Sequence, residues 1–211
     1  MIPSETEMYN ALVERHGEDL QKKISSAKVA VCGLGGLGSN IAIALARAGV
    51  GQLHIIDFDR VDISNLNRQQ YFAEQVGLYK TEALSENLHR IAPYCKITTD
   101  CIKLDENNIL SILKDDDIIC EAFDVAEEKA ILVNCILENF PEKFIVGGSG
   151  MAGLGSANTI KTRKIMKNFY LCGDGESDVS DGMGLYSSRV MVCAGHQANM
   201  ILRIIAGEFN V

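Results

Sequence analysis

The sequence contains no apolar run long enough to span a membrane, and its first ten residues, MIPSETEMYN, are neither basic nor apolar enough for a signal peptide. Both absences favour a cytoplasmic protein with no membrane partner. The chain also has no internal repeat and no low-complexity segment, and its 47% hydrophobic and 23% charged residues are ordinary for a folded protein. We therefore expect a folded chain rather than a disordered one.

Positive charge is scarce. Twenty Lys and Arg residues stand against 28 Asp and Glu, which leaves a net charge of −8. This balance argues against a nucleic-acid partner, because such a partner requires a basic footprint. The one dense basic stretch, KTRKIMK (161–167), is interpreted as a solvated strand end, and a docking patch for an acidic protein is the alternative.

Paired cysteines are also missing. The chain has 7 cysteines, none of them in a C-x-x-C pair, and it lacks a secretion signal. We therefore expect neither a disulfide framework nor a structural zinc site. Cys32, Cys120 and Cys193 lie in apolar runs, where a thiol usually behaves as a small hydrophobic group.

Strand-like and helix-like segments alternate through the first 150 residues. The expected strands are 28–33, 52–57, 96–102, 116–124 and 143–149, and the expected helices are 8–25 (broken or bent near Gly17), 36–48, 80–91, 107–114 and 127–140. Such alternation predicts an α/β fold, Rossmann-like, with a mainly parallel sheet and helices on both faces.

The pattern changes after Gly150. Residues 156–164 and 168–173 predict a hairpin or two edge strands, and an acidic, glycine-rich loop (173–184) leads to a closing helix at 188–207. No second domain with its own core fits in this length. We expect a single domain over 1–211, made of an N-terminal helical segment (1–26), a nucleotide-binding core (27–150) and C-terminal strands and helix (151–211).

A glycine-dense turn in KVAVCGLGGLGSN (28–40) matches the Rossmann fingerprint. Gly33 makes the tight turn, Gly35 lets a phosphate approach the backbone, and Gly38 permits close helix–strand packing. Asp57, at the end of the next strand, stands where an acid binds a ribose hydroxyl. The pattern predicts a nucleotide without separating NAD from ATP, and the missing lysine of a G-K-[ST] ending excludes a P-loop.

The segment DFDRVDISNLNRQQYF (57–72) indicates which of the two nucleotides binds. It carries the acid pair Asp57 and Asp59 and then polar residues that can reach phosphates, namely Asn65, Asn67, Arg68, Gln69 and, opening the next helix, Lys80. Arginine and lysine suit a triphosphate whose α-phosphorus is to be attacked. A dehydrogenase would also need a substrate domain that this length does not supply. We therefore interpret the turn as a site for ATP.

With these motifs in place, the chain resembles the ThiF/MoeB adenylyltransferases, relatives of the ubiquitin-activating enzymes, from about residue 20 to residue 207. The resemblance rests on GLGGLGSN, DFDRVDISNLNRQQ, the lysine after VGLY, EAFD at the end of the fourth strand and GHQANMILRIIAGE in the last helix. The segments SNLNRQQYF and GSGMAG are similar to those of the short thiamine-biosynthesis branch.

The resemblance implies an enzyme that uses ATP and magnesium to adenylate the C-terminal glycine carboxylate of a ubiquitin-like sulfur carrier ending in Gly-Gly, for the thiazole half of thiamine. It also implies a homodimer. The alternatives are another carboxylate, on a molybdopterin-type carrier or a tRNA threonylcarbamoyl group, and a non-catalytic scaffold. The presence of Arg68, Lys80 and Asp124 argues against the scaffold.

Roles for single residues follow from the same resemblance. The residues that would bind ATP are Gly33, Gly35, Gly36, Gly38, Asp57, Asp59, Asn65, Arg68, Gln69 and Lys80. The glycines would hold the phosphates, Asp57 would bind the ribose, and Arg68 and Lys80 would stabilise the charge of the departing pyrophosphate. No general base is required, because a carboxylate nucleophile is already ionised at pH 7.

Magnesium would be bound by Asp124 and Asp59, and Asp124 would join Arg68 and Lys80 in catalysis. A helix N-cap is the alternative for Asp124. The C-x-x-C pairs with which larger relatives bind zinc are missing, so we expect no zinc.

Three further residues carry hypotheses. Cys172, in YLCGDGES, stands next to a polar loop and could handle sulfur, although the acids at 174, 176 and 178 would raise its pKa. Arg15 could reach the ATP of a partner subunit or be an ordinary surface charge. His196 is expected in the core or in an interface.

Overall fold

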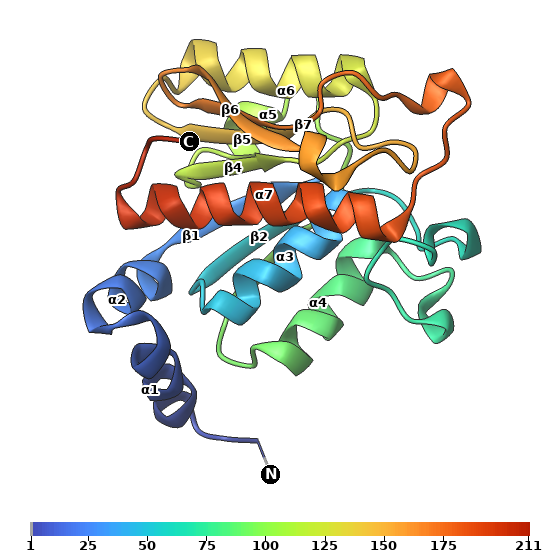
Figure 1. The fold of residues 1–211 in the computed structure, drawn as a ribbon. Helices are drawn as coiled ribbons and strands as arrows, with labels where there is room; N and C mark the ends of the chain where they lie inside the picture. Colours follow the sequence, from blue (N-terminus) through green and yellow to red (C-terminus); the bar gives the residue numbers. More distant parts are fainter. Residues whose placement is uncertain (1) are drawn as a thin grey trace.

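The computed structural model describes residues 2–211, and its strands form one sheet in the order β3-β2-β1-β4-β5-β7-β6 (Figure 1). The strands are β1 (Lys28–Cys32), β2 (Gln52–Ile56), β3 (Lys96–Asp100), β4 (Ile118–Glu121), β5 (Phe144–Gly148), β6 (Lys161–Met166) and β7 (Phe169–Gly173). All neighbouring pairs are parallel except β6 and β7. The predicted Rossmann-like, mainly parallel sheet is confirmed.

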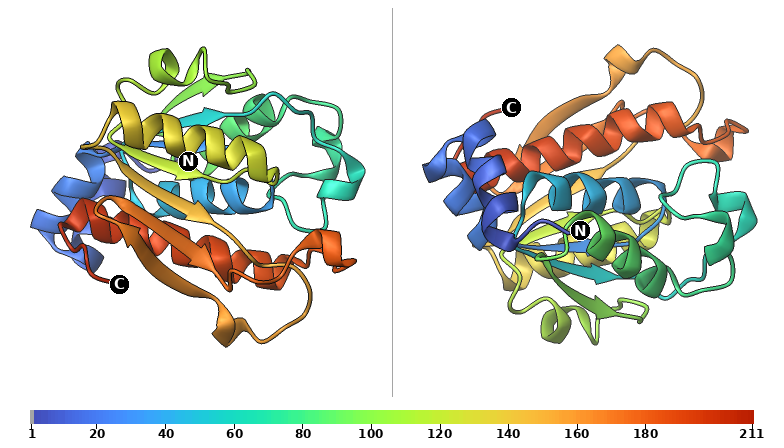
Figure 2. Two further views of the ribbon diagram at one scale, coloured as in Figure 1. Left: turned by 90° about the horizontal axis from the view of Figure 1, so that it is seen from above. Right: turned by 90° about the horizontal axis from the view of Figure 1, so that it is seen from below.

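Helices cover both faces of the sheet. One face carries α3 (Gly36–Ala48), α4 (Lys80–Ile91) and α7 (Ser187–Ala206), and the other carries α5 (Ile109–Ile112) and α6 (Ala126–Asn139) (Figure 2). Val29 and Val31 of β1 point into the first layer, while Ala30 and Cys32 point into the second. Because both faces are covered, β1 and β4 are apolar over residues 29–32 and 118–120.

The N-terminal segment forms two helices, α1 (Glu5–His16) and α2 (Glu18–Ser26), separated by Gly17 at φ 82°. The predicted break is therefore confirmed, but the first helix begins earlier than residue 8. Ser4 explains this start, since its hydroxyl accepts from the Glu7 N–H at 3.3 Å and its own N–H donates to the Glu7 carboxylate at 2.8 Å. Within residues 2–211, no helix combines the length and apolar character needed to cross a bilayer.

Two strand predictions need correction. The segment expected as a strand over 116–124 stays in the sheet only through Glu121, so residues 122–124 form a loop. The C-terminal hairpin is present, but the alternative of two edge strands is wrong, because β7 pairs with both β5 and β6, and only β6 of the two lies at an edge of the sheet. The loop after β4 matters because it carries Asp124.

The order in which the chain adds strands to the sheet reverses at β1. The chain passes from β1 outward through β2 to β3, and then returns to the other side of β1 to build β4 and β5. Crevices form at such a point outside the carboxyl ends of parallel strands. The glycine turn after β1 and the loops after β2 and β4 all lie at this edge.

Candidate functional site

A cavity of about 490 Å³ lies at the carboxyl ends of the central strands. Its walls are the glycine turn after β1, residues 56–59 after β2, residues 122–126 after β4 and residues 148–152 after β5. Most of the predicted site residues line this one cavity, namely Gly33, Gly35, Gly36, Asp57, Asp59, Asn65, Arg68, Gln69, Lys80 and Asp124. The fold thus brings together residues that lie up to 91 positions apart (33 to 124).

The glycine turn requires glycine for steric reasons. Gly33 has φ 89°, and a Cβ there would lie 2.9 Å from the Ala122 carbonyl oxygen. Gly35 is the N-cap of α3, so the first turn of this helix presents bare backbone to the cavity. A helix N-terminus with exposed N–H groups attracts anions.

Gly38 behaves differently from the other glycines of the motif. It does not line the cavity among the described residues, and a Cβ on it would collide with the Gly33 carbonyl oxygen. Gly38 thus packs α3 closely against the turn, and its contact with phosphate stays a prediction.

Asp57 ties the end of β2 to the glycine turn. Its Oδ2 accepts the Leu34 N–H at 2.6 Å, and its Oδ1 accepts the Asp59 N–H at 2.7 Å. Burial raises the pKa of this carboxyl, and the nearby Lys80 charge and the two N–H groups oppose the rise. The carboxylate is therefore rigidly held in the wall of the cavity.

Lys80 begins α4 and has a buried side chain. Its Nζ lies 2.8 Å from Asp59 Oδ2 and 3.7 Å from Asp57 Oδ2. Asp59, a predicted magnesium ligand, is thus engaged with a cation. This ion pair holds the Lys80 ammonium group beside the cavity.

Arg68 and Gln69 face the glycine turn from the loop after the short 3-10 helix Ile63–Asn65. The Arg68 guanidinium donates to the Asn67 side-chain oxygen at 2.8 Å and to the Ser64 carbonyl at 3.2 Å, and its stem lies over Gly36. Gln69 is buried, and its Oε1 has no hydrogen-bond partner among residues 2–211.

Asp124 lies in the loop Ala122–Val125 and its side chain is exposed to the cavity. The α6 N-cap is Val125 and makes no side-chain cap, so the N-cap alternative for Asp124 is not realised. Within residues 2–211 the Asp124 carboxylate makes no hydrogen bond or ion pair. Magnesium takes oxygen ligands and keeps several waters, so an exposed carboxylate facing the glycine turn fits this ion.

Sequence reasoning missed a buried ion pair beside Asp124. Glu121, the last residue of β4, lies 2.8 Å from the Lys129 Nζ of α6. Burial raises the pKa of Glu121, and the Lys129 charge opposes this. The one signal in the sequence was an acid at the end of an otherwise apolar strand, IICE.

Cys172 is a buried residue of β7 and does not line the cavity. Burial raises its pKa to about 11, while the Thr162 hydroxyl and the Arg163 charge lower it. The predicted direction was right, but its cause is burial rather than the neighbouring acids. Cys172 does stand next to the polar loop that follows β7, but its thiol is buried, which disfavours the predicted handling of sulfur.

Arg15 and His196 lie outside the cavity. Arg15 is exposed on α1, which lies at the amino-terminal end of the sheet (Figure 1). His196 is half-buried, with Nδ1 3.0 Å from the Thr162 hydroxyl.

The fold and cavity define a Rossmann-like protein with a glycine turn at a helix N-terminus, flanked by Arg68 and Lys80. This chain belongs to the ThiF family, whose model matches residues 9–211. It is 37% identical over 142 residues to an adenylyltransferase and sulfurtransferase MOCS3 of Caenorhabditis briggsae, covering 66% of this chain and 35% of that protein. It is 33% identical over 168 residues to a molybdopterin-synthase adenylyltransferase of Salmonella typhimurium, and this match covers 78% of this chain and 66% of that protein.

Solved structures resemble the whole chain. The E. coli tRNA N6-threonylcarbamoyladenosine dehydratase TcdA, in complex with ATP, superposes with a TM-score of 0.88 and covers 99% of this chain and 98% of its own, at 22% identity. At this identity the likeness shows the fold alone. The chain spans about a third of the MOCS3 relative's length.

Proposed function

We propose that this protein is an adenylyltransferase that transfers AMP from ATP to a carboxylate and releases pyrophosphate. The observation that carries the proposal is the convergence of Arg68, Lys80 and Asp124 on the glycine turn within one cavity. Relatives named as adenylyltransferases support it.

The residues of the cavity supply what this reaction needs. The first turn of α3 and the glycine turn bind phosphate through backbone N–H groups, and the Asp57 carboxylate accepts from the ribose. Arg68 and Lys80 neutralise charge as pyrophosphate leaves, and Lys80 exchanges Asp59 for phosphate oxygens when ATP enters. The substrate carboxylate attacks the α-phosphorus in line and needs no general base.

Asp124 is the residue that we propose to hold magnesium. The ion, when bound, compensates phosphate charge and orients the triphosphate. Asp59 is the second predicted ligand, available once Lys80 turns to the phosphates.

The proposed substrate is the C-terminal glycine of a ubiquitin-like sulfur carrier that ends in Gly-Gly. The relatives named for molybdopterin synthase and for sulfurtransferase activity support a sulfur carrier. The segments SNLNRQQYF and GSGMAG favour a carrier for the thiazole half of thiamine over a molybdopterin-type carrier. The net charge of −8 disfavours tRNA.

We further propose that the enzyme works as a homodimer in the cytoplasm, where ATP is supplied. The helix α1, which carries Arg15, lies at the end of the sheet opposite to the cavity (Figure 1), so a role for Arg15 in catalysis requires the cavity of a second subunit.

The experiment is exchange of labelled pyrophosphate into ATP, run with a thiamine-type carrier, a molybdopterin-type carrier or unmodified and threonylcarbamoyl tRNA. We expect exchange that depends on the thiamine-type carrier. Exchange with the molybdopterin-type carrier or formation of a tRNA product would keep adenylation and overturn the substrate. Tight ATP binding without exchange in any arm would indicate the scaffold.

A further inference from the structure

Glu121 is a buried acid at the end of β4, directly before the cavity-lining residues 122–126, and the proposed chemistry does not use it. Its side chain is 2% exposed. A buried carboxylate is costly unless it is paired and fully hydrogen-bonded. Its Oε1 accepts from the Phe123 N–H and from the Lys129 Nζ, both at 2.8 Å.

Lys129 connects three elements through one ammonium group. Its stem projects from α6, and its Nζ donates both to Glu121 at the end of β4 and to the Gly148 carbonyl at the end of β5, at 2.9 Å. The strand β5 leaves room for this arrangement with Gly147, where a Cβ would lie 2.9 Å from Glu121 Oε2. The pair therefore joins β4, β5 and α6 beneath the cavity.

The loop Ala122–Val125 lies between Glu121 and Lys129 in the chain, and it carries Asp124. At its start the Ala122 N–H donates to the Cys32 carbonyl at 2.9 Å, and the Ala122 carbonyl packs against Gly33 of the glycine turn. The next N–H, of Phe123, is held by Glu121. Because no hydrogen bond or ion pair within residues 2–211 holds the Asp124 carboxylate itself, its direction depends on this short stretch of backbone.

We propose that Glu121 and Lys129 are positioning residues that fix the Asp124 loop against the glycine turn, so that the Asp124 carboxylate meets the divalent cation of Mg·ATP. This inference rests on the proposed function. It assigns Lys129 to the support of the loop, in contrast to Arg68 and Lys80, which we assign to the phosphates. The competing role for Lys129 is a third phosphate-binding cation, since it also lines the cavity.

Nucleotide titrations separate the two roles. ATP affinity is measured by calorimetry with EDTA and with increasing Mg²⁺, for the wild type, Lys129→Met, Glu121→Gln and the double variant, which removes both charges and preserves volume. Loss of a group that orients a metal ligand lowers metal affinity about 10-fold to 100-fold. We expect that loss in all three variants, an unchanged affinity for ATP in EDTA, and partial rescue in Lys129→Arg.

A phosphate-binding Lys129 gives a different result. Lys129→Met would then weaken ATP binding in EDTA, and Glu121→Gln, which releases the ammonium, would tighten it. Either change would overturn the positioning role.

Hydrogen exchange of the nucleotide-free protein tests the pair independently of catalysis. We expect the Phe123 amide to exchange at least about tenfold faster in each variant, because its acceptor at position 121 loses its negative charge, its Lys129 partner or both. Lys103→Met is the matched control. It breaks the 2.8 Å ion pair between Lys103 and Glu128, which precedes Lys129 in α6, and it should leave the exchange rate of the Phe123 amide unchanged. Unchanged protection in the double variant would overturn the inference, whereas failure of pyrophosphate exchange in the wild type alone would overturn only the proposed function.

Discussion

Some residues of the cavity are needed to maintain the fold, whereas others are needed only for the proposed reaction. Asp57 accepts two backbone N–H groups, so its replacement would disturb the glycine turn as well as the ribose site. Arg68 and Asp124 lie at the surface of the cavity, and neither makes an ion pair within residues 2–211. Their removal should therefore leave the fold intact.

Arg68→Ala and Asp124→Ala are predicted to lower pyrophosphate exchange by about 100-fold or more, the usual cost of removing one group that stabilises developing charge. Arg47→Ala and Asp115→Ala are matched controls, since both residues are exposed and lie outside the cavity. Thermal unfolding should be unchanged in all four variants. Normal exchange in Arg68→Ala and Asp124→Ala would show that the site is assigned wrongly.

Gly33→Ala is predicted to destabilise the protein by about 1–3 kcal/mol and to weaken ATP binding, because a Cβ at φ 89° is strained and would press on Ala122. Gly77→Ala is the control for strain alone, since Gly77 has φ 92° and nothing lies within 4 Å of a Cβ there. Urea unfolding of both variants checks this. An equal loss of stability in the two would contradict a steric requirement at Gly33.

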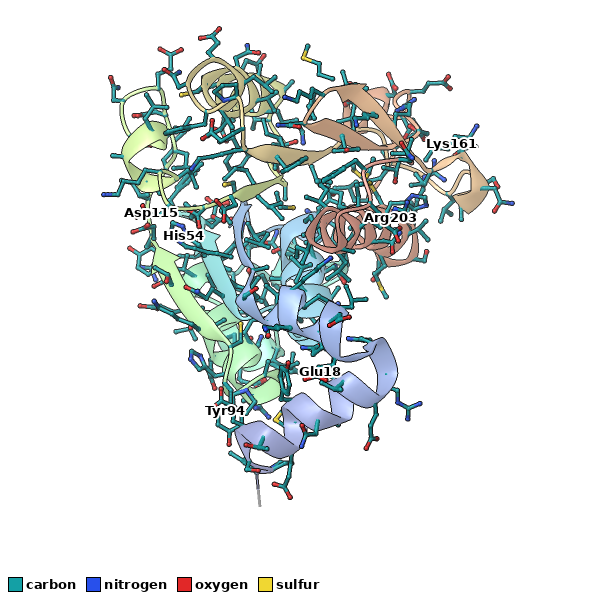
Figure 3. The ribbon with its side chains drawn as sticks, turned by 90° about the vertical axis from the view of Figure 1, so that its left-hand side faces the viewer. Glu18, His54, Tyr94, Asp115, Lys161 and Arg203 are labelled. Atoms are coloured by element: carbon teal, nitrogen blue, oxygen red, sulfur yellow. The ribbon has the colours of Figure 1, made fainter. Side chains whose placement is uncertain are left out.

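Neighbouring strands of the sheet are joined by a buried histidine. His54 of β2 places Nδ1 2.8 Å from Asp116, just before β4, and Nε2 2.8 Å from Asp100 of β3. Lys28 of β1 lies 3.2 Å from the other Asp116 oxygen. Figure 3 shows His54 close to Asp115, at the amino-terminal end of β4. This cluster joins β1, β2, β3 and the residue Asp116 before β4 across one side of the sheet.

The cluster predicts a pH-dependent stability. Burial lowers the pKa of His54, but the hydrogen bonds and charges of Asp116 and Asp100 outweigh it and raise the pKa above 6.5. The stabilisation by the imidazolium is therefore complete below about pH 6.5 and is lost as the pH rises through the folded-state pKa.

Urea unfolding between pH 5.5 and 8.5 measures this contribution. His54→Gln should be less stable at the acidic end and should lose the part of the pH slope that His54 supplies. His89→Gln, an exposed residue of α4, should keep the wild-type slope. A wild-type slope in His54→Gln would contradict the prediction.

The position of α1 relative to the cavity limits the role that Arg15 can have. Its helix α1 extends from the end of the sheet opposite to the cavity, so it can complete a site only in a second copy of the chain (Figure 1). In a two-fold dimer each cavity would combine Arg68 of one subunit with Arg15 of the other.

Subunit mixing tests this arrangement. Arg15→Ala and Arg68→Ala should each be nearly inactive, and mixing them should restore about a quarter of wild-type exchange, because half of the randomly paired dimers carry one intact site. Sedimentation should show dimers throughout. Full activity of Arg15→Ala, or no recovery on mixing, would indicate that Arg15 is an ordinary surface charge.

The sequence by itself determined the features that depend on local backbone and burial. The alternation of apolar strands and amphipathic helices predicted the parallel sheet, and Gly33 and Asp57 marked the strand ends where the cavity forms. Motifs whose residues lie close together in the chain were enough to predict the family. These signals are readable because strand periodicity, a tight turn and a helix start each involve residues close together in the chain.

Only the tertiary structure decided which side chains meet. It paired Lys80 with Asp59, placed Asp124 on a loop instead of a strand end or a cap, and buried Cys172 in the core. It also brought Glu121 to Lys129 beneath that loop. These contacts join different elements, and their geometry depends on how the crossovers pack helices against the sheet, which local patterns in the sequence do not specify.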